Sequence, residues 1–417
     1  MNSKPKLRFH EFIDDWEQRK LSEIATMHAR IGWQNLRTSE FLDQGDYMLI
    51  TGTDFDDGRI NYSTCHYVEK ERYDQDPHIQ IHNGSILITK DGTLGKVAYV
   101  QGLEMPATLN AGVFNVEIKD ENYVDGKYLF QYLKAPFLMD YVGQKATGGT
   151  IKHLNQNILV DFPVVLPEKS EQEKIGQYLE GIDNLITLHQ RKLDNIKEYK
   201  AGMLQKMFPK EGEDIPEVRF PEFTYAWEQR KLSDITSKIG SGKTPLGGKE
   251  AYVDDGICLI RSQNVYDDKV DLSDVVYIDE EIDNSMSNSR VIAGDVLLNI
   301  TGASIGRSAV YTEIKSANVN QHVCIIRPVE GFESKYIQLN LASNNGKKQI
   351  DASQAGGGRE GLNFQQIGKM EFMFPKIEEQ KKIGAFFSNI DNLIILHQRK
   401  LDELKEYKQG LLQQMFA

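Results

Sequence analysis

The chain has 417 residues, of which 40% are hydrophobic and 26% charged, a composition typical of a globular protein with about two to four domains. No apolar run approaches the roughly 18 residues of a spanning helix, and the polar start has no apolar segment behind it, so we expect neither a membrane protein nor a secreted one. Three isolated cysteines (Cys65, Cys258 and Cys324) argue against a disulfide framework and favour a reducing cytoplasm. The net charge of −12 excludes a surface that is basic throughout.

Two segments of the sequence occur twice. Trp16–Ile24 returns as Trp227–Ile235 with one substitution, of Glu23 by Asp234, and Glu171–Phe208 returns as Glu379–Phe416 with most of its residues unchanged. Between these ends the copies differ strongly and share only a skeleton of short glycine-containing stretches. Even drift after a duplication would spread the differences along the chain, so this pattern favours two domains specialised for different targets and held on matched connectors.

The connectors show a heptad pattern. Steps of three and four place apolar residues on one stripe of each copy, with a histidine at the matching position: Ile175, Leu179, Ile182, Ile186, His189 and Leu193 in the first, and Ile383, Phe387, Ile390, Ile394, His397 and Leu401 in the second. This spacing predicts two long helices that pair as a coiled coil. An antiparallel pair is favoured because each helix ends where the next domain starts. The histidines could form a metal pair or a pH switch, but a polar residue that sets the register is favoured, and we expect no metal.

The variable regions have the pattern of mixed α/β domains. Runs rich in β-branched residues predict strands at 47–50, 85–88, 97–100 and 113–116, and at 258–260, 296–298, 309–311 and 323–326. One short helix is expected in each domain, near 128–141 and 334–344. The predicted organisation is a first variable domain (1–166), a helical connector (167–209), a second variable domain (210–374) and a second connector (375–417). The fold class is therefore two α/β domains related by a pseudo-twofold axis and separated by two long antiparallel helices.

Motifs for catalysis are missing. Gly240–Thr244 ends like a phosphate-binding P-loop, but the required earlier glycine is Ser237, and Pro245 stands where the loop should enter a helix. The chain has no Pro-Pro pair of an amino-methyltransferase and no hydrolase or metalloprotease signature. These absences argue against an enzyme that is complete in one chain.

Glycine-rich polar loops occur at equivalent places in both copies. One pair is Thr89–Lys96 and Asn299–Arg307, and the other is Lys145–His153 and Gln354–Arg359. Glycine lets a backbone approach a ligand closely, and hydroxyl, amide and basic side chains hold phosphates and read base edges. Ordinary solvated turns have the same composition, so the loops alone leave the choice open.

The repeated segments at the ends of each half favour DNA binding over ordinary turns, through a resemblance to a known family. W-E-x-x-K-L opens each half (Trp16–Leu21 and Trp227–Leu232), and E-Q-x-K-I-G opens each connector (Glu171–Gly176 and Glu379–Gly384). Over nearly its whole length the chain resembles the specificity subunit of type I restriction–modification systems.

This resemblance implies a cytoplasmic subunit without catalytic residues, metal or cofactor of its own. Each variable domain would be a target recognition domain that reads half of a bipartite double-stranded DNA target, and the helices would set the gap. Two modification subunits would supply S-adenosylmethionine chemistry, and restriction subunits would supply ATP- and Mg-dependent cleavage.

The candidate DNA contacts are basic and hydroxyl residues, most of them in these loops: Lys90, Thr93, Lys96, Lys152 and His153 in the first domain, and Arg261, Thr301, Ser304, Arg307 and Arg359 in the second. The acidic span Asp267–Asp283 is expected to face away from DNA, and the isolated chain to bind DNA weakly and with strong salt dependence. The alternative function is a non-enzymatic two-headed scaffold whose variable domains bind proteins.

Overall fold

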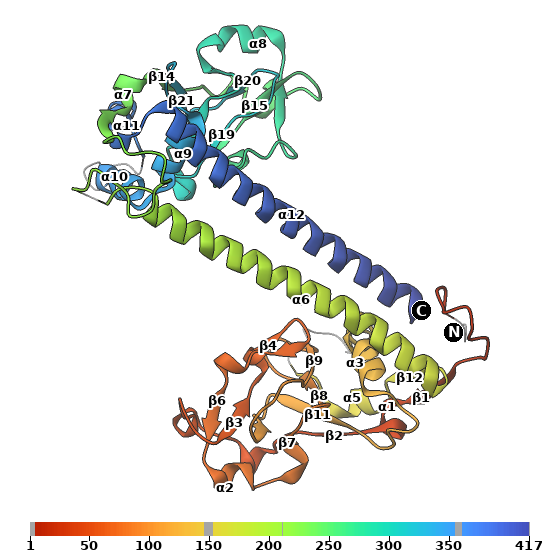
Figure 1. Ribbon diagram of the computed structural model, residues 1–417. Helices are drawn as coiled ribbons and strands as arrows, with labels where there is room; N and C mark the ends of the chain where they lie inside the picture. Colours follow the sequence, from red (N-terminus) through yellow and green to blue (C-terminus); the bar gives the residue numbers. More distant parts are fainter. Residues whose placement is uncertain (1–4, 146–152, 211, 355–360, 417) are drawn as a thin grey trace. The chain divides into compact units, whose positions relative to one another are not determined.

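The structure is a computed structural model that describes residues 5–145, 153–210, 212–354 and 361–416. The chain divides into two compact units, which are residues 1–189 with 399–417 (unit 1) and residues 190–398 (unit 2). Each unit therefore contains one variable domain together with parts of both long helices (Figure 1).

The first variable domain is built on two four-stranded sheets. One sheet is antiparallel, in the order β2 (Ala25–His28), β11 (Val113–Ile118), β8 (Ile86–Thr89), β9 (Val97–Tyr99). The other has the order β6 (His66–Val68), β3 (Tyr47–Ile50), β10 (Ala107–Leu109), β7 (Gln80–Ile81), in which only β3 and β10 are parallel. Apolar side chains from both sheets share one core, because Leu87 and Ala98 of the first pack with Ile50 and Leu109 of the second.

The second variable domain repeats this topology. Its sheets have the orders β14 (Thr236–Ser241), β21 (Val323–Pro328), β18 (Val296–Asn299), β19 (Ser308–Val310), and β16 (Val276–Ile278), β15 (Ile257–Ile260), β20 (Ala317–Val319), β17 (Arg290–Val291). In each half a two-stranded ribbon carries the repeated W-E-x-x-K-L segment, as β1 (Glu17–Lys20) with β12 (Pro163–Leu166) and β13 (Glu228–Lys231) with β22 (Glu371–Phe374). The first domain also has a small hairpin of β4 (Phe55–Asp56) and β5 (Arg59–Ile60).

The single helix predicted in each domain is wrong, because the structure has two there. In the first domain α3 (Gly126–Lys134) and α4 (Phe137–Lys145) are separated by Ala135 and Pro136, and a proline cannot continue the hydrogen bonds of a helix. In the second, α9 (Ser334–Ala342) and α10 (Asn344–Gln354) are separated by Ser343, whose hydroxyl donates back to the Asn340 carbonyl. The remaining α-helices are short: α1 (Leu21–Ile24), α2 (Lys70–Tyr73), α5 (Gln156–Val160), α7 (Leu232–Ile235), α8 (Glu280–Ser285) and α11 (Phe364–Gly368).

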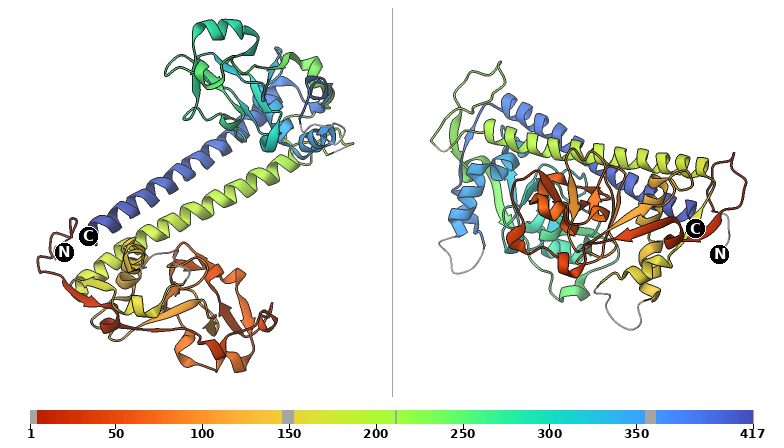
Figure 2. Two further views of the ribbon diagram at one scale, coloured as in Figure 1. Left: turned by 180° about the vertical axis from the view of Figure 1, so that it is seen from behind. Right: turned by 90° about the horizontal axis from the view of Figure 1, so that it is seen from below.

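The two connectors are the long helices α6 (Lys169–Lys206) and α12 (Ile377–Met415), with 38 and 39 residues. In unit 1 the first half of α6 meets the last turns of α12, where the hydroxyls of Tyr178 and Tyr407 lie 2.8 Å apart. In unit 2 the end of α6 meets the beginning of α12, where Tyr199 and Phe386 pack edge to face. The helices therefore run antiparallel, and the predicted fold class is confirmed. In unit 1, α3 lies against α6 (Figure 2).

Candidate nucleic-acid interface and helical junctions

In the first domain the two predicted loops lie beside each other. The backbone N–H of Leu154 donates to the Lys90 carbonyl at 2.8 Å, and the His153 ring and the Asp91 carboxylate are 2.5 Å apart. Thr89 closes the first loop, because the Lys96 N–H donates to its hydroxyl at 2.9 Å. Two stretches that are far apart in the sequence thus form one polar surface at the end of β8.

The predicted contacts on this surface differ in exposure. Thr93, Lys96 and His153 are exposed. Lys90 is half-buried, with its ammonium 5.3 Å from the centre of the Phe114 ring, a cation–π contact that holds the side chain at the base of the loop. Lys152 lies outside the described residues.

In the second domain, the residues that directly follow Gln354–Arg359 meet the first loop in the same way. The Leu362 N–H donates to the Ile300 carbonyl at 2.9 Å, and Thr301 forms a β-bridge with Gly361. Ser304 is half-buried in the turn, whereas Arg307 is exposed and its guanidinium lies 5.9 Å from the centre of the Tyr266 ring.

One of the predicted arginines, Arg261, stands apart from this loop pair. The Arg261 side chain donates to the Asp274 carbonyl at 3.1 Å, so part of its donor capacity stabilises its own loop. Arg359 lies outside the described residues. The assignment of all ten loop residues to DNA contacts stays a prediction.

The structure adds polar residues that the motif search did not select. The Thr301 hydroxyl lies 2.6 Å from Nδ1 of His322, and Nε2 of His322 lies 3.3 Å from the amide nitrogen of Gln321. The amide oxygen of Gln321 accepts a hydrogen bond from the Thr244 hydroxyl. These four side chains form a polar row along the loops of the second domain. The run Asn320–His322 directly before a strand was the available signal, but its proximity to Thr244 depends on tertiary folding.

The P-loop-like segment has a structural explanation. Gly240 and Ser241 belong to β14, and a Cβ atom on Gly242 would lie 1.5 Å from the Val319 carbonyl oxygen. Glycine is required there by close backbone packing. No α-helix follows this strand among the described residues until α8, whereas a P-loop leads directly into a helix.

Acidic residues of the span Asp267–Asp283 are used within the domain. Asp279 caps α8 by accepting from the Ile282 N–H at 2.8 Å, and Asp283 accepts from Arg290 at 2.9 Å. Asp268 binds lysines at the junction with the long helices. Their charges are thereby partly compensated inside the protein.

The predicted helix stripe is largely buried. None of nine of its residues exposes more than 7% of its surface: Ile175, Leu179, Ile182, Ile186, Leu193, Ile383, Phe387, Ile390 and Leu401. The other three (Ile394, His189 and His397) are half-buried.

At the junction of unit 2, two lysines and two aspartates form a half-buried ion-pair network. Lys200 of α6 contacts Asp391 of α12 at 2.6 Å and also binds Asp268, while Lys335 of α9 contacts the same two carboxylates at 2.7 and 3.1 Å. Burial disfavours the charge of Lys200, but the carboxylates of Asp268 and Asp391 outweigh it and raise its pKa. The network ties the second domain to both helices.

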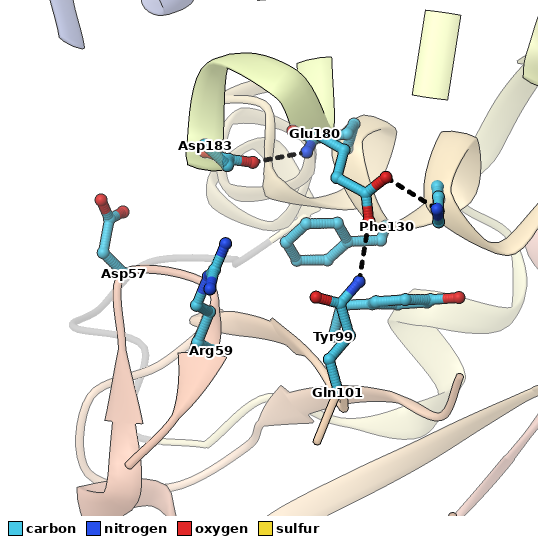
Figure 3. Close-up of a pocket in the computed structure, with 10 residues that line it drawn as sticks. Asp57, Arg59, Tyr99, Gln101, Phe130, Glu180 and Asp183 are labelled. Atoms are coloured by element: carbon cyan, nitrogen blue, oxygen red, sulfur yellow. Dashed lines mark hydrogen bonds and ion pairs between the residues drawn. The ribbon is translucent and has the colours of Figure 1, made fainter. Parts of the chain in front are cut away.

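The junction of unit 1 contains the equivalent lysine–aspartate ion pair between α6 and α12, in other surroundings. Lys408 of α12 contacts both carboxylate oxygens of Asp183 of α6, at 2.6 and 2.8 Å. Gln131 of α3 donates to the same Asp183 carboxylate (Figure 3). Burial, and next the positive charge of Lys134, lower the pKa of Lys408 to about 8. Around a small cavity beside this pair, Glu180 accepts from Gln101 and Lys127 (Figure 3).

The repeated E-Q sequence at the start of each long helix has an anchoring role. Glu171 is fully buried and accepts two hydrogen bonds from Arg8, at 2.8 and 2.7 Å, and one from Trp16 at 3.2 Å. Glu379 binds Arg219 in the same bidentate way. The adjacent glutamine, for example Gln172, bonds backbone groups on either side of the junction. The shared motifs therefore hold the helix starts to the preceding segments.

Within the described part of the chain, no helix is both long and apolar enough to cross a membrane. The chain has two repeated α/β domains, and each of them carries a polar loop surface and is fixed to the antiparallel helix pair. These features define a class of internally duplicated, two-headed recognition proteins. The family model of the type I restriction modification DNA specificity domain matches residues 13–198 and 225–406. The chain belongs to this family.

Individual relatives agree with this assignment. The chain is 21% identical over 413 residues to the type I restriction enzyme MjaVIII specificity subunit of Methanocaldococcus jannaschii, with 95% of each chain covered. It is 25% identical over 330 residues to the EcoBI specificity subunit of Escherichia coli, covering 75% of this chain and 69% of the relative. The crystal structure of the S subunit from M. genitalium matches over 99% of both chains with a TM-score of 0.65 at 15% identity, which supports the fold.

Proposed function

We propose that this protein is the DNA sequence-specificity subunit of a type I restriction–modification complex. Each variable domain reads one half of a bipartite double-stranded target, and the helix pair sets the length of the unread gap. The observation that carries this proposal is the pair of loop surfaces: both domains bring the same two loops together on the same frame, with different side chains on them. A shared frame with divergent loops suits two readers of different base sequences.

Recognition is expected to combine two kinds of contact. Basic and hydroxyl groups, such as Lys96 in the first domain and Arg307 in the second, bind phosphates and set the register, while a few polar side chains reach base edges. The polar row that ends at His322 provides donors and acceptors for such edges. Because the net charge of the chain is −12, the isolated subunit should bind DNA weakly and with strong dependence on salt.

The helix pair also offers a duplicated surface for partners. Leu185 and Leu188 on α6 expose 46% and 45% of their surfaces, and the equivalent Leu393 and Leu396 on α12 expose 47% and 50%. Exposed apolar side chains at matching sites favour two copies of one partner. We assign these sites to two modification subunits.

The chemistry of the complex is then supplied by partners. In this proposal the chain carries no catalytic group, the modification subunits bind S-adenosylmethionine, and restriction subunits use ATP and Mg. The subunit selects the sequence on which those partners act.

Methylome sequencing tests the proposal. A methylation-free host expressing this chain with its modification partner should acquire methylated adenines or cytosines at one bipartite sequence with a fixed gap. Replacing the second variable domain with that of a relative should change one half of this sequence and leave the other half and the gap unchanged. Methylation without a sequence pattern, or a pattern that ignores the exchange, would contradict the assignment.

A further inference from the structure

Three potential metal ligands converge in the first domain, outside the loop surface. They are His28 on β2, Glu117 on β11 and His78 in the 3-10 turn Pro77–Ile79, and their ligand atoms all lie within 4.8 Å of one another. Nε2 of His28 is 3.8 Å from a Glu117 carboxylate oxygen, and the rings of His28 and His78 are stacked with centroids 4.5 Å apart.

The backbone holds the three residues in place. In the register of β2 and β11, His28 stands opposite Asn115, so His28 and Glu117 are diagonal neighbours on one face of the sheet. Asn115 is buried and its side-chain amide donates to the His78 carbonyl at 3.1 Å, while the His78 N–H donates to the Asp76 carboxylate at 2.9 Å. The turn that carries the third ligand is therefore tied to the strand that carries the second.

The donor set suits a borderline-soft divalent metal. Two imidazoles and one carboxylate are a ligand set of zinc sites that keep a fourth position for water. Among the described residues Glu117 forms no ion pair with a lysine or arginine, so its carboxylate is available to a cation. Tetrahedral zinc needs donor atoms about 3.4 Å apart, since its bonds to N and O are about 2.0–2.1 Å. The Glu117 side chain, which is 43% exposed, and the exposed His78 ring can both rotate to supply this contraction.

The second domain provides an internal comparison. The equivalent positions are Gly240, which stands opposite Ile325 in β21, Asn288 in the turn Ser287–Ser289, and Arg327. Arg327 binds the buried carboxylate of Asp295 at 2.7 Å. An ion pair thus occupies the place of the trio, and the cluster is a property of the first domain alone.

We propose that His28, His78 and Glu117 form a zinc site that keeps a fourth position for water. His28 and Glu117 belong to the sheet β2-β11-β8-β9, whereas His78 directly precedes β7 of the other sheet. A bound ion cross-links the two sheets of the first domain. This differs from the metal-free chain expected from the sequence, and it does not depend on the DNA-binding proposal.

Calorimetry on the full chain tests this site. After removal of any affinity tag and treatment with a chelator, the protein is titrated with ZnCl2 at pH 7.5. One ion per chain should bind, and hydrogen exchange should slow in the segment around His78 when zinc is present.

Matched variants assign the ligands. His78→Ala and Glu117→Gln should each weaken binding more than about tenfold, while His82→Gln, at another exposed histidine, should leave it unchanged. Circular dichroism in chelator checks that each variant is folded. Absence of stoichiometric binding by the native chain, or equal affinity in the native chain and the folded His78→Ala variant, would overturn the proposal.

Discussion

The two junctions between variable domain and helix pair share one element and differ in the rest. Lys200 with Asp391 in unit 2 and Lys408 with Asp183 in unit 1 are equivalent ion pairs, each between α6 and α12. In unit 2 the second domain adds Asp268, which neutralises the network and raises the pKa of Lys200.

In unit 1 the acid at the corresponding turn is used elsewhere. Asp57, which has a left-handed φ of 41° as Asp268 has one of 66°, binds Lys134 of α3 at 2.9 Å. The charge of Lys134 then adds to burial in lowering the pKa of Lys408 to about 8. The comparison shows that the connectors keep their pairing chemistry while each domain completes the junction in its own way, so divergence of the domains need not disturb the helices.

The largest expected effect is at the helix anchors. Glu171→Ala and Glu379→Ala each leave a mostly buried arginine without its carboxylate, which should lower the free energy of unfolding of the corresponding unit by about 3–5 kcal/mol. Glu171→Ala should cost more, since Glu171 also accepts from Trp16, whereas Trp227 Nε1 has no hydrogen-bond partner within the described residues. Hydrogen exchange in urea, followed separately for the two units, measures both. The exposed neighbour Glu378→Ala is the control and should change stability by less than about 0.5 kcal/mol.

The junction lysines should show the next effect. Lys200→Met leaves Asp268 and Asp391 with only Lys335 and should destabilise unit 2 by about 3 kcal/mol. Lys408→Met should destabilise unit 1 by only about 1 kcal/mol, because its charge is already disfavoured by burial and Gln131 still donates to Asp183. Urea unfolding monitored in each unit decides this. Equal losses would mean that the two junctions are energetically the same.

The loop surfaces should act independently of each other. Arg307→Ala should reduce discrimination in the second half-site by about 1–3 kcal/mol if Arg307 reads a base, with no change in the first half-site. Lys96→Ala should have the reverse pattern. Competition binding with duplexes altered in one half-site, in the presence of the modification partner, separates the two. If neither specificity nor overall affinity changes in Arg307→Ala, the assignment of this residue is wrong.

The smallest expected effect is a pH dependence with opposite signs in the two units. The folded pKa of Lys408 is about 8, below its ordinary 10.5, so between these values the unfolded chain binds more protons and the stability of unit 1 should rise with pH, by roughly 1 kcal/mol from pH 8 to 9. The pKa of Lys200 is raised, so its contribution to unit 2 is fully present below 10.5 and is lost only above that pH. Unfolding at pH 8 and 9 should show the gain in unit 1, and Lys408→Met should abolish it.

Much of the architecture could be predicted from local patterns. The heptad stripe predicted the buried positions of α6 and α12, and strands such as Tyr47–Ile50 were found from β-branched composition. The break in the helices of each domain was missed. Pro136 signalled it in the first copy, but no proline marks it in the second, where the Ser343 hydroxyl donates to the Asn340 carbonyl. For the loops, composition indicated where polar ligands could bind but not which side chains meet.

The sequence by itself determined the duplication, the antiparallel helix pair and the family, because repeats and heptad spacing are visible along the chain. Only the tertiary structure decided how residues far apart in the chain combine. It placed Asp268 between two lysines, joined His322 to Thr301, and brought His28, His78 and Glu117 together. Such contacts depend on strand register and on helix docking, and these are set by the packing of the whole domain.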